Sequence, residues 1–459
     1  MYYIIAKLPF IWLISSDMTN IKDIEKNNIQ FLINRAIVSD DGKEYSLPLK
    51  DIIIDFNPFE SFYNSINQFY GKGFRILFLC SKEWYDFTQS LKGAFCSREF
   101  FADDFVMQEN IVSIKAAERF TANLKDDTRL IIGVGGYKVI ETAKLISSSS
   151  KLPLVLYITT PECDTAISPY VCAYHNGIKD MFTTVTPQIV CVDMSIMDIS
   201  QSSLGNGLGV LASKLTALWD WHFSNIFNNE SCDYSLAQAA LSIIKNFCQN
   251  AGNILYGDKS VIFDMIQTQL KLSAICQFAQ NPRLMGGGED SMYNVLEMFF
   301  LKENKELRNR GENLILCAKL IFRAYKVWLE KLKIETFFCP PDNTLRLEKL
   351  TDYLGLSELV ALKKIYMVDN AEQWEIMQYK WNEYKDDLKT KLDEYYVFFQ
   401  KLEKIFKRIY KDAGFWTTKY LTESDIMLML GLAPDSSSKF TMLSFVKMTG
   451  ILDMYLEGV

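Results

Sequence analysis

The sequence predicts an α/β domain with a parallel sheet, followed by an all-helical domain. Over the first 200 residues, short apolar runs alternate with amphipathic stretches of helical period. Strand–helix–strand spacing of this kind produces a parallel sheet that is covered by helices on both faces. After about residue 200, glycines and β-branched runs become rarer and helical periodicity continues almost to the end. We therefore expect domains at 1–200 and 201–459, with ligands held in the cleft between them.

Five apolar runs are the expected strands of the sheet, and three amphipathic stretches are the expected helices between them. The strands are expected at 51–56, 74–80, 129–134, 154–159 and 188–192, and the helices at 59–70, 114–124 and 138–147. Residues 28–50 resemble an added hairpin that turns at Asp40-Asp-Gly-Lys43. The charged, aromatic-rich stretch 372–411 predicts one or two exposed helices, because alternating Lys and Glu are typical of a solvated helix face.

The N-terminal segment 1–16 is apolar and could be mistaken for a signal peptide. It has no basic region at its start, it is interrupted by Lys7 and Pro9, and no cleavage site of small residues follows. We expect it to form the first strand instead.

Composition excludes several classes of protein. The chain has 459 residues with 49 basic and 56 acidic side chains, and a net charge of −7 argues against a general nucleic-acid binder. No apolar run reaches the roughly 18 residues that a membrane span needs. The ten cysteines are irregularly spaced without a CxxC pair, which predicts free thiols in a reducing compartment and a cytoplasmic protein. Only His175 and His222 are present, so a histidine-rich metal site is excluded.

The strongest local motif is a glycine-rich turn in residues 130–144, Leu-Ile-Ile-Gly-Val-Gly-Gly-Tyr-Lys-Val-Ile-Glu-Thr-Ala-Lys. An apolar strand leads into Gly133, Gly135 and Gly136, and a helix follows at once. Such glycines let the backbone approach a pyrophosphate, whose charge the helix N-terminus stabilises. The alternative is a tight strand–helix turn that needs glycine only for its positive φ. The motif makes 1–200 a candidate nucleotide-binding domain, although it is not GxGxxG.

A second motif lies at 156–169, where a strand ends in Thr159 and Thr160, followed by Asp164 and then Ser168-Pro169. Hydroxyl and carboxylate groups at the end of a strand can contact a ribose, a nicotinamide or a polyol. Thr-Pro and Ser-Pro pairs also simply begin turns. Three further segments place glycines in loops beside helices: 205–221, 283–290 with 310–313, and 431–445.

Taken in order, these segments resemble the sn-glycerol-1-phosphate dehydrogenase family, within the superfamily of iron-containing alcohol dehydrogenases and dehydroquinate synthases. The resemblance extends over about residues 50–455. Residues 133–144 resemble the family's GxGGGxxxDxAK loop, with Glu141 in place of the usual Asp and Tyr137 in place of the third Gly. Residues 158–169 resemble PTxxSxDxxxSP, residues 207–221 resemble GxGDxxxKxTAxxDW, and residues 433–443 resemble the AP-Asp…RYTxL ending.

The resemblance implies a dehydroquinate synthase-like fold and a cytoplasmic NAD(P)-dependent oxidoreductase whose helical domain carries a metal and substrate site. The cofactor-binding residues that it implies are Gly133, Gly135, Gly136, Tyr137, Lys144, Thr159 and Thr160. The substrate residues are Asp164, Lys179, Lys214 and Arg283, and the candidates for catalysis are Asp164, Lys214 and Arg310. Tyr137 either fills the space of the missing glycine or stacks on a base, so NAD or NADP binding stays open.

The three positions that hold the metal in this family carry Val210, Asp290 and Arg310 in this chain. Val210 offers no lone pair and Arg310 repels a cation, so we expect no metal. The loss is serious because a Lewis acid contributes several kcal/mol to hydride transfer. Arg310 could replace the metal's charge against an oxyanion. We favour the other interpretation, an Arg310–Asp290 ion pair that clasps the structure.

Three functions remain open for such a chain: an oxidoreductase that works without the usual metal, an inactive homologue that binds a nucleotide or phosphorylated ligand, and a different reaction on a phosphorylated substrate. The expected partner is therefore a dinucleotide or a small phosphorylated molecule, with a homo-oligomer left open. Several charged residues also have structural interpretations. Asp220 is expected to hold helices together, Arg283 and Glu289 to form an ion pair, and both histidines to lie at the surface or in packing contacts.

Overall fold

The computed structural model describes residues 19–108, 111–332, 341–365, 374–410, 420–457 and 459. The strand expected at the N-terminus and Cys339 lie outside these ranges. The nine cysteines within them are free thiols, as their irregular spacing predicts.

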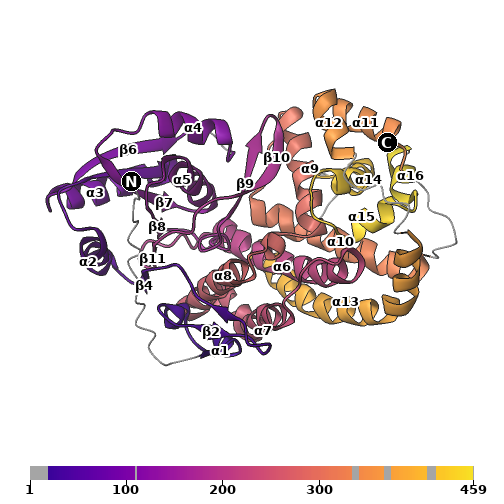
Figure 1. The fold of residues 1–459 in the computed structure, drawn as a ribbon, viewed down its shortest axis with the longest axis horizontal. Helices are drawn as coiled ribbons and strands as arrows, with labels where there is room; N and C mark the ends of the chain where they lie inside the picture. The colour runs from indigo at the N-terminus through magenta and orange to yellow at the C-terminus, as the bar shows by residue number, and fades with distance from the viewer. Residues whose placement is uncertain (1–18, 109–110, 333–340, 366–373, 411–419, 458) are drawn as a thin grey trace, which may run out of the picture.

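The first part of the chain forms a six-stranded sheet in the order β4-β11-β8-β7-β5-β6, and every neighbouring pair of strands is parallel (Figure 1). Apolar runs that are buried on both faces produce this arrangement. The strands are β4 Asp51–Asp55, β5 Arg75–Ser81, β6 Phe101–Met107, β7 Thr128–Gly135, β8 Leu154–Ile158 and β11 Ile189–Asp193. The helices between them are α2 Phe59–Tyr70, α3 Tyr85–Cys96, α4 Ile114–Ala122 and α5 Tyr137–Ser150, with the short η2 Lys82–Trp84.

Alternate residues of the strands enter two separate cores, one on each face of the sheet. On one face, Phe78 and Ile132 pack with Phe62 and Phe95 from α2 and α3. On the other face, residues such as Leu79 join the large core that continues into the helical region. This alternation follows from the two-residue period of a strand. The five predicted strands and the predicted fold class are confirmed.

Strand β6 was not predicted because it lies at the edge of the sheet and carries two aspartates. Asp103 accepts from Arg75 and Lys125, and Asp104 pairs with Lys92, so neither carboxylate needs a buried position. Charged side chains are a common feature of edge strands.

The hairpin of β9 Tyr170–His175 and β10 Ile178–Thr183 was also missed. Its two-residue turn is Asn176-Gly177, and both residues have positive φ (53° and 84°), as the tight hairpin turn requires. The hairpin projects from the sheet region and lies beside the helical region (Figure 1). It therefore forms one wall between the two parts of the chain.

The hairpin expected at 28–50 is smaller than predicted. Residues Ile29–Leu32 form the 3-10 helix η1, and only β2 Ile37–Val38 and β3 Glu44–Tyr45 pair as antiparallel strands. Strand β1 Thr19–Asn20 pairs with β2, and the short helix α1 is Asp23–Lys26. This segment lies against α7 and α8: the Ile29 amide donates to Gln267 at 2.7 Å.

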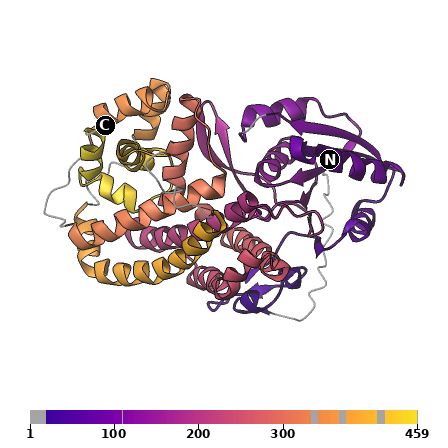
Figure 2. The same cartoon turned by 180° about the vertical axis from the view of Figure 1, so that it is seen from behind.

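The remainder of the chain is helical, as predicted. Seen from behind, the helices that directly follow residue 200 lie between the sheet region and the C-terminal helices (Figure 2). The α-helices are α6 Gln201–Asn228, α7 Tyr234–Asn250, α8 Lys259–Ala279, α9 Gly288–Lys302, α10 Arg310–Lys331, α11 Asn343–Asp352, α12 Glu358–Ile365, α13 Trp374–Tyr410, α14 Glu423–Leu432, α15 Met442–Lys447 and α16 Ile451–Glu457. The 3-10 helices are η3 Ala251–Tyr256, η4 Pro282–Met285 and η7 Ala433–Asp435.

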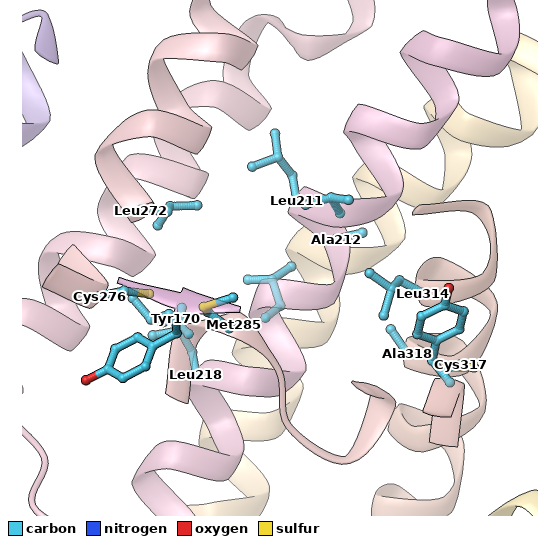
Figure 3. Packing of buried hydrophobic residues seen from close by; sticks show 14 of the residues in the cluster. Tyr170, Leu211, Ala212, Leu218, Leu272, Cys276, Met285, Leu314, Cys317 and Ala318 are labelled. Carbon is cyan, nitrogen blue, oxygen red and sulfur yellow. The ribbon is translucent and has the colours of Figure 1, made fainter. Parts of the chain in front are cut away.

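Helix α6 is the centre of this helical region. Figure 3 shows Leu211 and Ala212 of α6 between Leu272 and Cys276 of α8 on one side and Leu314 and Ala318 of α10 on the other. Helices α6 and α10 approach very closely, because a Cβ added at Gly209 would overlap the carbonyl of Gly311. Glycine at both positions therefore sets the distance between the two helices.

Residues 372–411 were expected to form one or two exposed helices. The helix is present, but the prediction that it is exposed is wrong for one of its faces, which is buried. The described residues form a single helix, α13, which packs along α6 and α10. Its buried residues recur at spacings of three, four and seven, so one stripe faces the core: Trp381, Leu388, Leu392, Phe399, Leu402 and Phe406. The abundant charges on the other face concealed this stripe in the sequence.

Among the helices of the described ranges, none combines the length and the apolar character needed to cross a bilayer.

We predict that Gly209→Ala lowers the free energy of unfolding by about 3 kcal/mol, because the added methyl group forces α6 and α10 apart. Gly252→Ala is the matched control, since a Cβ there meets no atom within 4 Å. Urea unfolding monitored by circular dichroism measures both. Equal midpoints for the two variants would show that the crossing tolerates a side chain.

Candidate functional site

The glycine turn between β7 and α5 has the shape expected of a phosphate-binding turn. Gly135 has φ +150°, and a Cβ at Gly136 would overlap the Thr160 hydroxyl, so glycine is needed at both positions. Helix α5 begins directly after Gly136, and no side chain in the described ranges caps its first N–H groups. Free N–H groups at a helix N-terminus attract an anion. The turn therefore fits the pyrophosphate of a dinucleotide.

Thr159 and Thr160 lie beside this turn, as the sequence implied. The Thr159 amide donates to the Gly135 carbonyl at 3.4 Å. Both threonine hydroxyl oxygens are buried, and neither has a hydrogen-bond partner within the part of the chain that the structure describes. These two hydroxyls could contact a bound nucleotide.

Lys144 is directed away from the turn and holds the loop that follows β8. Its Nζ donates to the carbonyls of Thr165 and Ser168 and lies 3.9 Å from Glu141. Burial lowers the pKa of Lys144 to about 8. Glu141 in turn accepts from the Cys172 amide at 2.9 Å. Both residues thus fix the loop and the hairpin beside the turn.

Four charged side chains meet where the loop after β8 approaches α6 and α10. Asp164 accepts from Lys214 at 2.5 Å and from Arg310 at 3.1 and 3.4 Å. Glu162 accepts from Arg310 at 2.9 Å and from the amide of Asn206. We call Glu162, Asp164, Lys214 and Arg310 the charge network. It contains all three residues predicted as catalytic candidates.

The pKa values of the two carboxylates of the charge network are shifted in opposite directions. Burial alone would raise the pKa of Asp164, but the charges of Arg310 and Lys214 outweigh it and hold that pKa below its ordinary value. For Glu162, burial dominates over Arg310 and raises the pKa. Asp164 is therefore the firmly ionised partner of the two cations.

The two departures from the family's motifs touch each other. The Arg310 guanidinium carbon lies 4.2 Å from the centre of the Tyr137 ring. This contact places Tyr137 over the charge network and close to the start of α5. A planar guanidinium stacks well on an aromatic face.

The predicted Arg310–Asp290 ion pair is wrong. Arg310 is the first residue of α10, and the close crossing of α10 with α6 directs its side chain to Glu162 and Asp164. Asp290 instead lies 3.9 Å from Lys439. Two carboxylates at the loop hold the guanidinium better than a single one on α9.

The residues at the three positions where the resemblance implies metal ligands do not fit a divalent cation. Val210 is fully buried, and it stands one helical turn from both Asn206 and Lys214, which contact the carboxylates. The Arg310 guanidinium already donates to both carboxylate oxygens of Asp164. Across the described ranges, no group of three or more His, Cys, Asp and Glu residues is arranged to hold a metal. His175 is exposed on the hairpin, and His222 contacts Lys391 on the side of α6.

The predicted Arg283–Glu289 ion pair is also wrong. Arg283 pairs with Glu230, which it contacts through both Nε and Nη2. Glu289 accepts from the Gly287 amide at 3.0 Å, and burial raises its pKa to about 7. The structural role of Asp220 is confirmed, since it accepts from the Gly288 amide, the Met442 amide and the Tyr325 hydroxyl.

Lys179 lies beside the charge network and not within it. Its Nζ contacts Glu297 at 2.8 Å and stands 4.5 Å from the ring centre of Tyr293. Lys179 lines a pocket of about 290 Å³ between the β9–β10 hairpin, the start of α9 and the loop after η7. The sequence singled out the segments 156–169, 205–221 and 431–445, but it did not identify Glu162, Asn206 or 436–439 within them as site residues. Asn294 lies outside these segments and was missed altogether.

Part of the sequence matches known dehydrogenases. The family model "Iron-containing alcohol dehydrogenase" matches residues 71–200. The glycerol-1-phosphate dehydrogenase [NAD(P)+] of Thermococcus kodakarensis is 25% identical over 210 residues, which cover 45% of this chain and 60% of that enzyme. The chain thus matches somewhat more than half the length of such curated relatives.

Solved structures share the fold at low sequence identity. The iron-containing alcohol dehydrogenase of Corynebacterium glutamicum superimposes with a TM-score of 0.55 at 14% identity, covering 91% of this chain and 96% of that one. The archaeal alcohol dehydrogenase ADH/D1 from a Red Sea brine pool gives a TM-score of 0.56 at 12% identity, covering 90% and 98%. Residues 71–200 thus match the family model of iron-containing alcohol dehydrogenases, and the chain shares the fold of these two solved structures.

Proposed function

We propose that this chain binds NAD(P) at its glycine turn and a small phosphorylated ligand in the adjoining cleft, without the metal-dependent hydride transfer that the family resemblance implies. One observation carries the proposal. Arg310 stands at a position where the family resemblance places a metal-binding histidine. Its guanidinium donates hydrogen bonds to Asp164 and Glu162. The polyol dehydrogenase lineage, with relatives named for glycerol 1-phosphate and NAD(P), supports the two ligand classes.

Each part of the candidate site has a separate task in this proposal. The N–H groups at the start of α5 and the glycines before them would hold the pyrophosphate. Thr159 and Thr160 would contact the nucleoside side of the cofactor. A bound NAD(P) would supply a hydride donor or acceptor. The charge network would fix the floor of the cleft, with Tyr137 laid over Arg310.

An oxidoreductase in which Arg310 replaces the metal is the second candidate, and the geometry disfavours it. To polarise a carbonyl, the guanidinium needs N–H groups aimed at the substrate oxygen. Arg310 directs Nη1 to both carboxylates and Nη2 to Asp164, and Tyr137 covers one face. Lys214 is likewise tied to Asp164. The same engagement argues against another reaction that would use these cations as acids.

The metal-free state is directly testable. We predict that the purified protein, dialysed after exposure to Zn²⁺ or Fe²⁺, retains far less than one metal per chain by elemental analysis. We also predict no dihydroxyacetone phosphate reduction with NADH or NADPH, with or without added metal. A triple variant with Val210→Asp, Asp290→His and Arg310→His restores the family's ligand set and serves as the positive control for metal uptake. Stoichiometric metal or turnover in the unaltered chain would refute the proposal.

The stability of the charge network should depend on Arg310 and on pH. We predict that Arg310→Met lowers the free energy of unfolding by about 3–5 kcal/mol at pH 7, because two buried carboxylates lose their shared cation. In the unaltered chain the pKa of Asp164 is depressed, so its contribution is present above the unfolded pKa of about 3.9 and is lost as pH falls through the folded value.

In Arg310→Met, burial is opposed by less positive charge, so both carboxylates take up protons more readily. The difference between variant and parent should therefore shrink between pH 7 and pH 5. Urea unfolding at several pH values measures this difference. A second variant that adds Glu162→Gln should recover part of the loss at pH 7. A pH-independent difference would show that Arg310 acts by packing alone.

Tyr137 should limit dinucleotide binding. We predict that Tyr137→Gly strengthens NADH binding about tenfold, since it removes the ring that stands at the first position of α5 and restores the family's glycine. Tyr137→Phe keeps the ring and should bind as the unaltered chain does. Titration of NADH fluorescence compares the three proteins. Weaker binding by the glycine variant would mean that the ring contacts the nucleotide instead of limiting it.

A further inference from the structure

Strand β5 ends beside the glycine turn, on the side away from the charge network. It is the parallel neighbour of β7, with Cys80 opposite Val134, so both strands end at the same edge of the sheet. The chain then continues into η2 after β5 and, through Gly136, into α5 after β7. Because neighbouring strands are about 4.8 Å apart, the first residues of η2 lie within about one ribose of the turn.

The topology of the sheet determines which half of a dinucleotide would lie over the end of β5. Ligands of parallel sheets bind outside the carboxyl ends of the strands. The loop after β8 carries Asp164, which contacts Lys214 and Arg310 in the helical region, so the cleft lies on the β8 side of β7. Strand β5 borders β7 on its other side. With its pyrophosphate at the glycine turn and its nicotinamide in the cleft, a dinucleotide would extend its adenosine toward the end of β5.

The residues at the end of β5 differ from those of an NAD site. In dinucleotide-binding sheets, an acidic side chain beside the adenosine ribose accepts from the 2′-hydroxyl of NAD, whereas a basic side chain accommodates the 2′-phosphate of NADP. Strand β5 ends in Ser81, and Lys82 follows directly. Lys138 stands in the first turn of α5, which contains no acidic residue. This edge thus offers basic side chains where an NAD site would have an acidic one.

Both lysines are available to a ligand. Lys82 and Lys138 are exposed, and neither has a hydrogen bond or an ion pair with another residue in the described ranges. Lys92, by contrast, pairs with Asp104 on β6. An ammonium has three N–H donors and no acceptor. A phosphate group could therefore engage Lys82 and Lys138 without breaking an existing ion pair.

Glu83 is the acidic residue of η2, and its own surroundings engage it. A hydrogen bond from Ser81 and the charges of Lys138 and Lys82 lower the pKa of Glu83. Its carboxylate is therefore held to the serine at the strand end. Two cations against one carboxylate leave a net positive charge over η2 and the first turn of α5, and such a charge attracts an anion.

From this arrangement we infer that the chain selects NADP(H) over NAD(H), with the 2′-phosphate of the adenosine ribose held by Lys82 and Lys138. The inference rests on the proposed function, for which it names the form of the dinucleotide and the residues that select it. Lys82 and Lys138 are the specificity-determining residues, because a phosphate accepts charge-assisted hydrogen bonds from them that are stronger than those of a neutral ribose hydroxyl.

Fluorescence titration of the full chain with NADPH and with NADH tests this selection. We predict that NADPH binds at least about tenfold more tightly than NADH. The double variant Lys82→Met and Lys138→Met should bind NADPH about tenfold more weakly and NADH as before, so that the two affinities become similar. Ser81→Asp places a carboxylate at the strand end, and it should weaken NADPH binding by a similar factor without weakening NADH binding.

Two controls isolate the adenosine half. Lys151→Met should leave both affinities unchanged, because Lys151 is exposed at the other end of α5. Calorimetry should show that adenosine 2′,5′-bisphosphate binds at least about tenfold more tightly than adenosine 5′-monophosphate, and that this advantage disappears in the double lysine variant. Neither fragment contains the nicotinamide, so this result does not depend on the cleft.

The outcome is separable from that of the proposed function. Equal or tighter binding of NADH, or an advantage of NADPH that persists in the double lysine variant, would overturn the inference and leave the dinucleotide site standing. Binding of neither dinucleotide would reject the dinucleotide site as well. Metal uptake or catalytic turnover in the other experiment would not alter either result.

Discussion

The arrangement of the cleft depends on the contact of Arg310 with Glu162 and Asp164. Together with Lys214, this contact balances two buried carboxylates with two cations, and such balance is what makes buried charges tolerable. It also ties the loop after β8 to α6 and α10, so the sheet region and the helical region share one network. Adding a divalent cation would leave an excess of buried positive charge. The four side chains therefore form a self-contained cluster in which the charges balance.

The sequence predicted the fold well wherever local pattern and final environment agree. The central strands β5, β7, β8 and β11 are buried on both faces, so their apolar runs are visible without any knowledge of partners. Strand β6 was not predicted, because its two aspartates do not resemble a buried strand and the cations that pair with them come from other elements. The β9–β10 hairpin did carry a local signal in Asn176-Gly177, which the search for parallel strands overlooked. The buried stripe of α13 was hidden because its charged face dominates the composition.

The candidate site was predictable in its members but not in their pairing. Asp164 and Lys214 were recognised as functional candidates, and they form a close ion pair. The partner of Arg310 was misjudged because it is decided by the tight crossing of α6 and α10, which no residue spacing reveals. The segment 431–445, which carries Lys439, was singled out, but its neighbours on α9 and β10 were not, because they are more than a hundred residues away in sequence. Motifs thus identified the residues, and helix packing decided which charges meet.

Glu297 joins two of the elements that border the pocket. Its carboxylate accepts from Lys179, Tyr174 and Tyr293, so it ties the β9–β10 hairpin to α9. The charge of Lys179 holds the pKa of Glu297 below its ordinary value against the effect of burial. Two walls of the pocket are therefore fixed before any ligand arrives, and pre-formed walls reduce the entropic cost of binding.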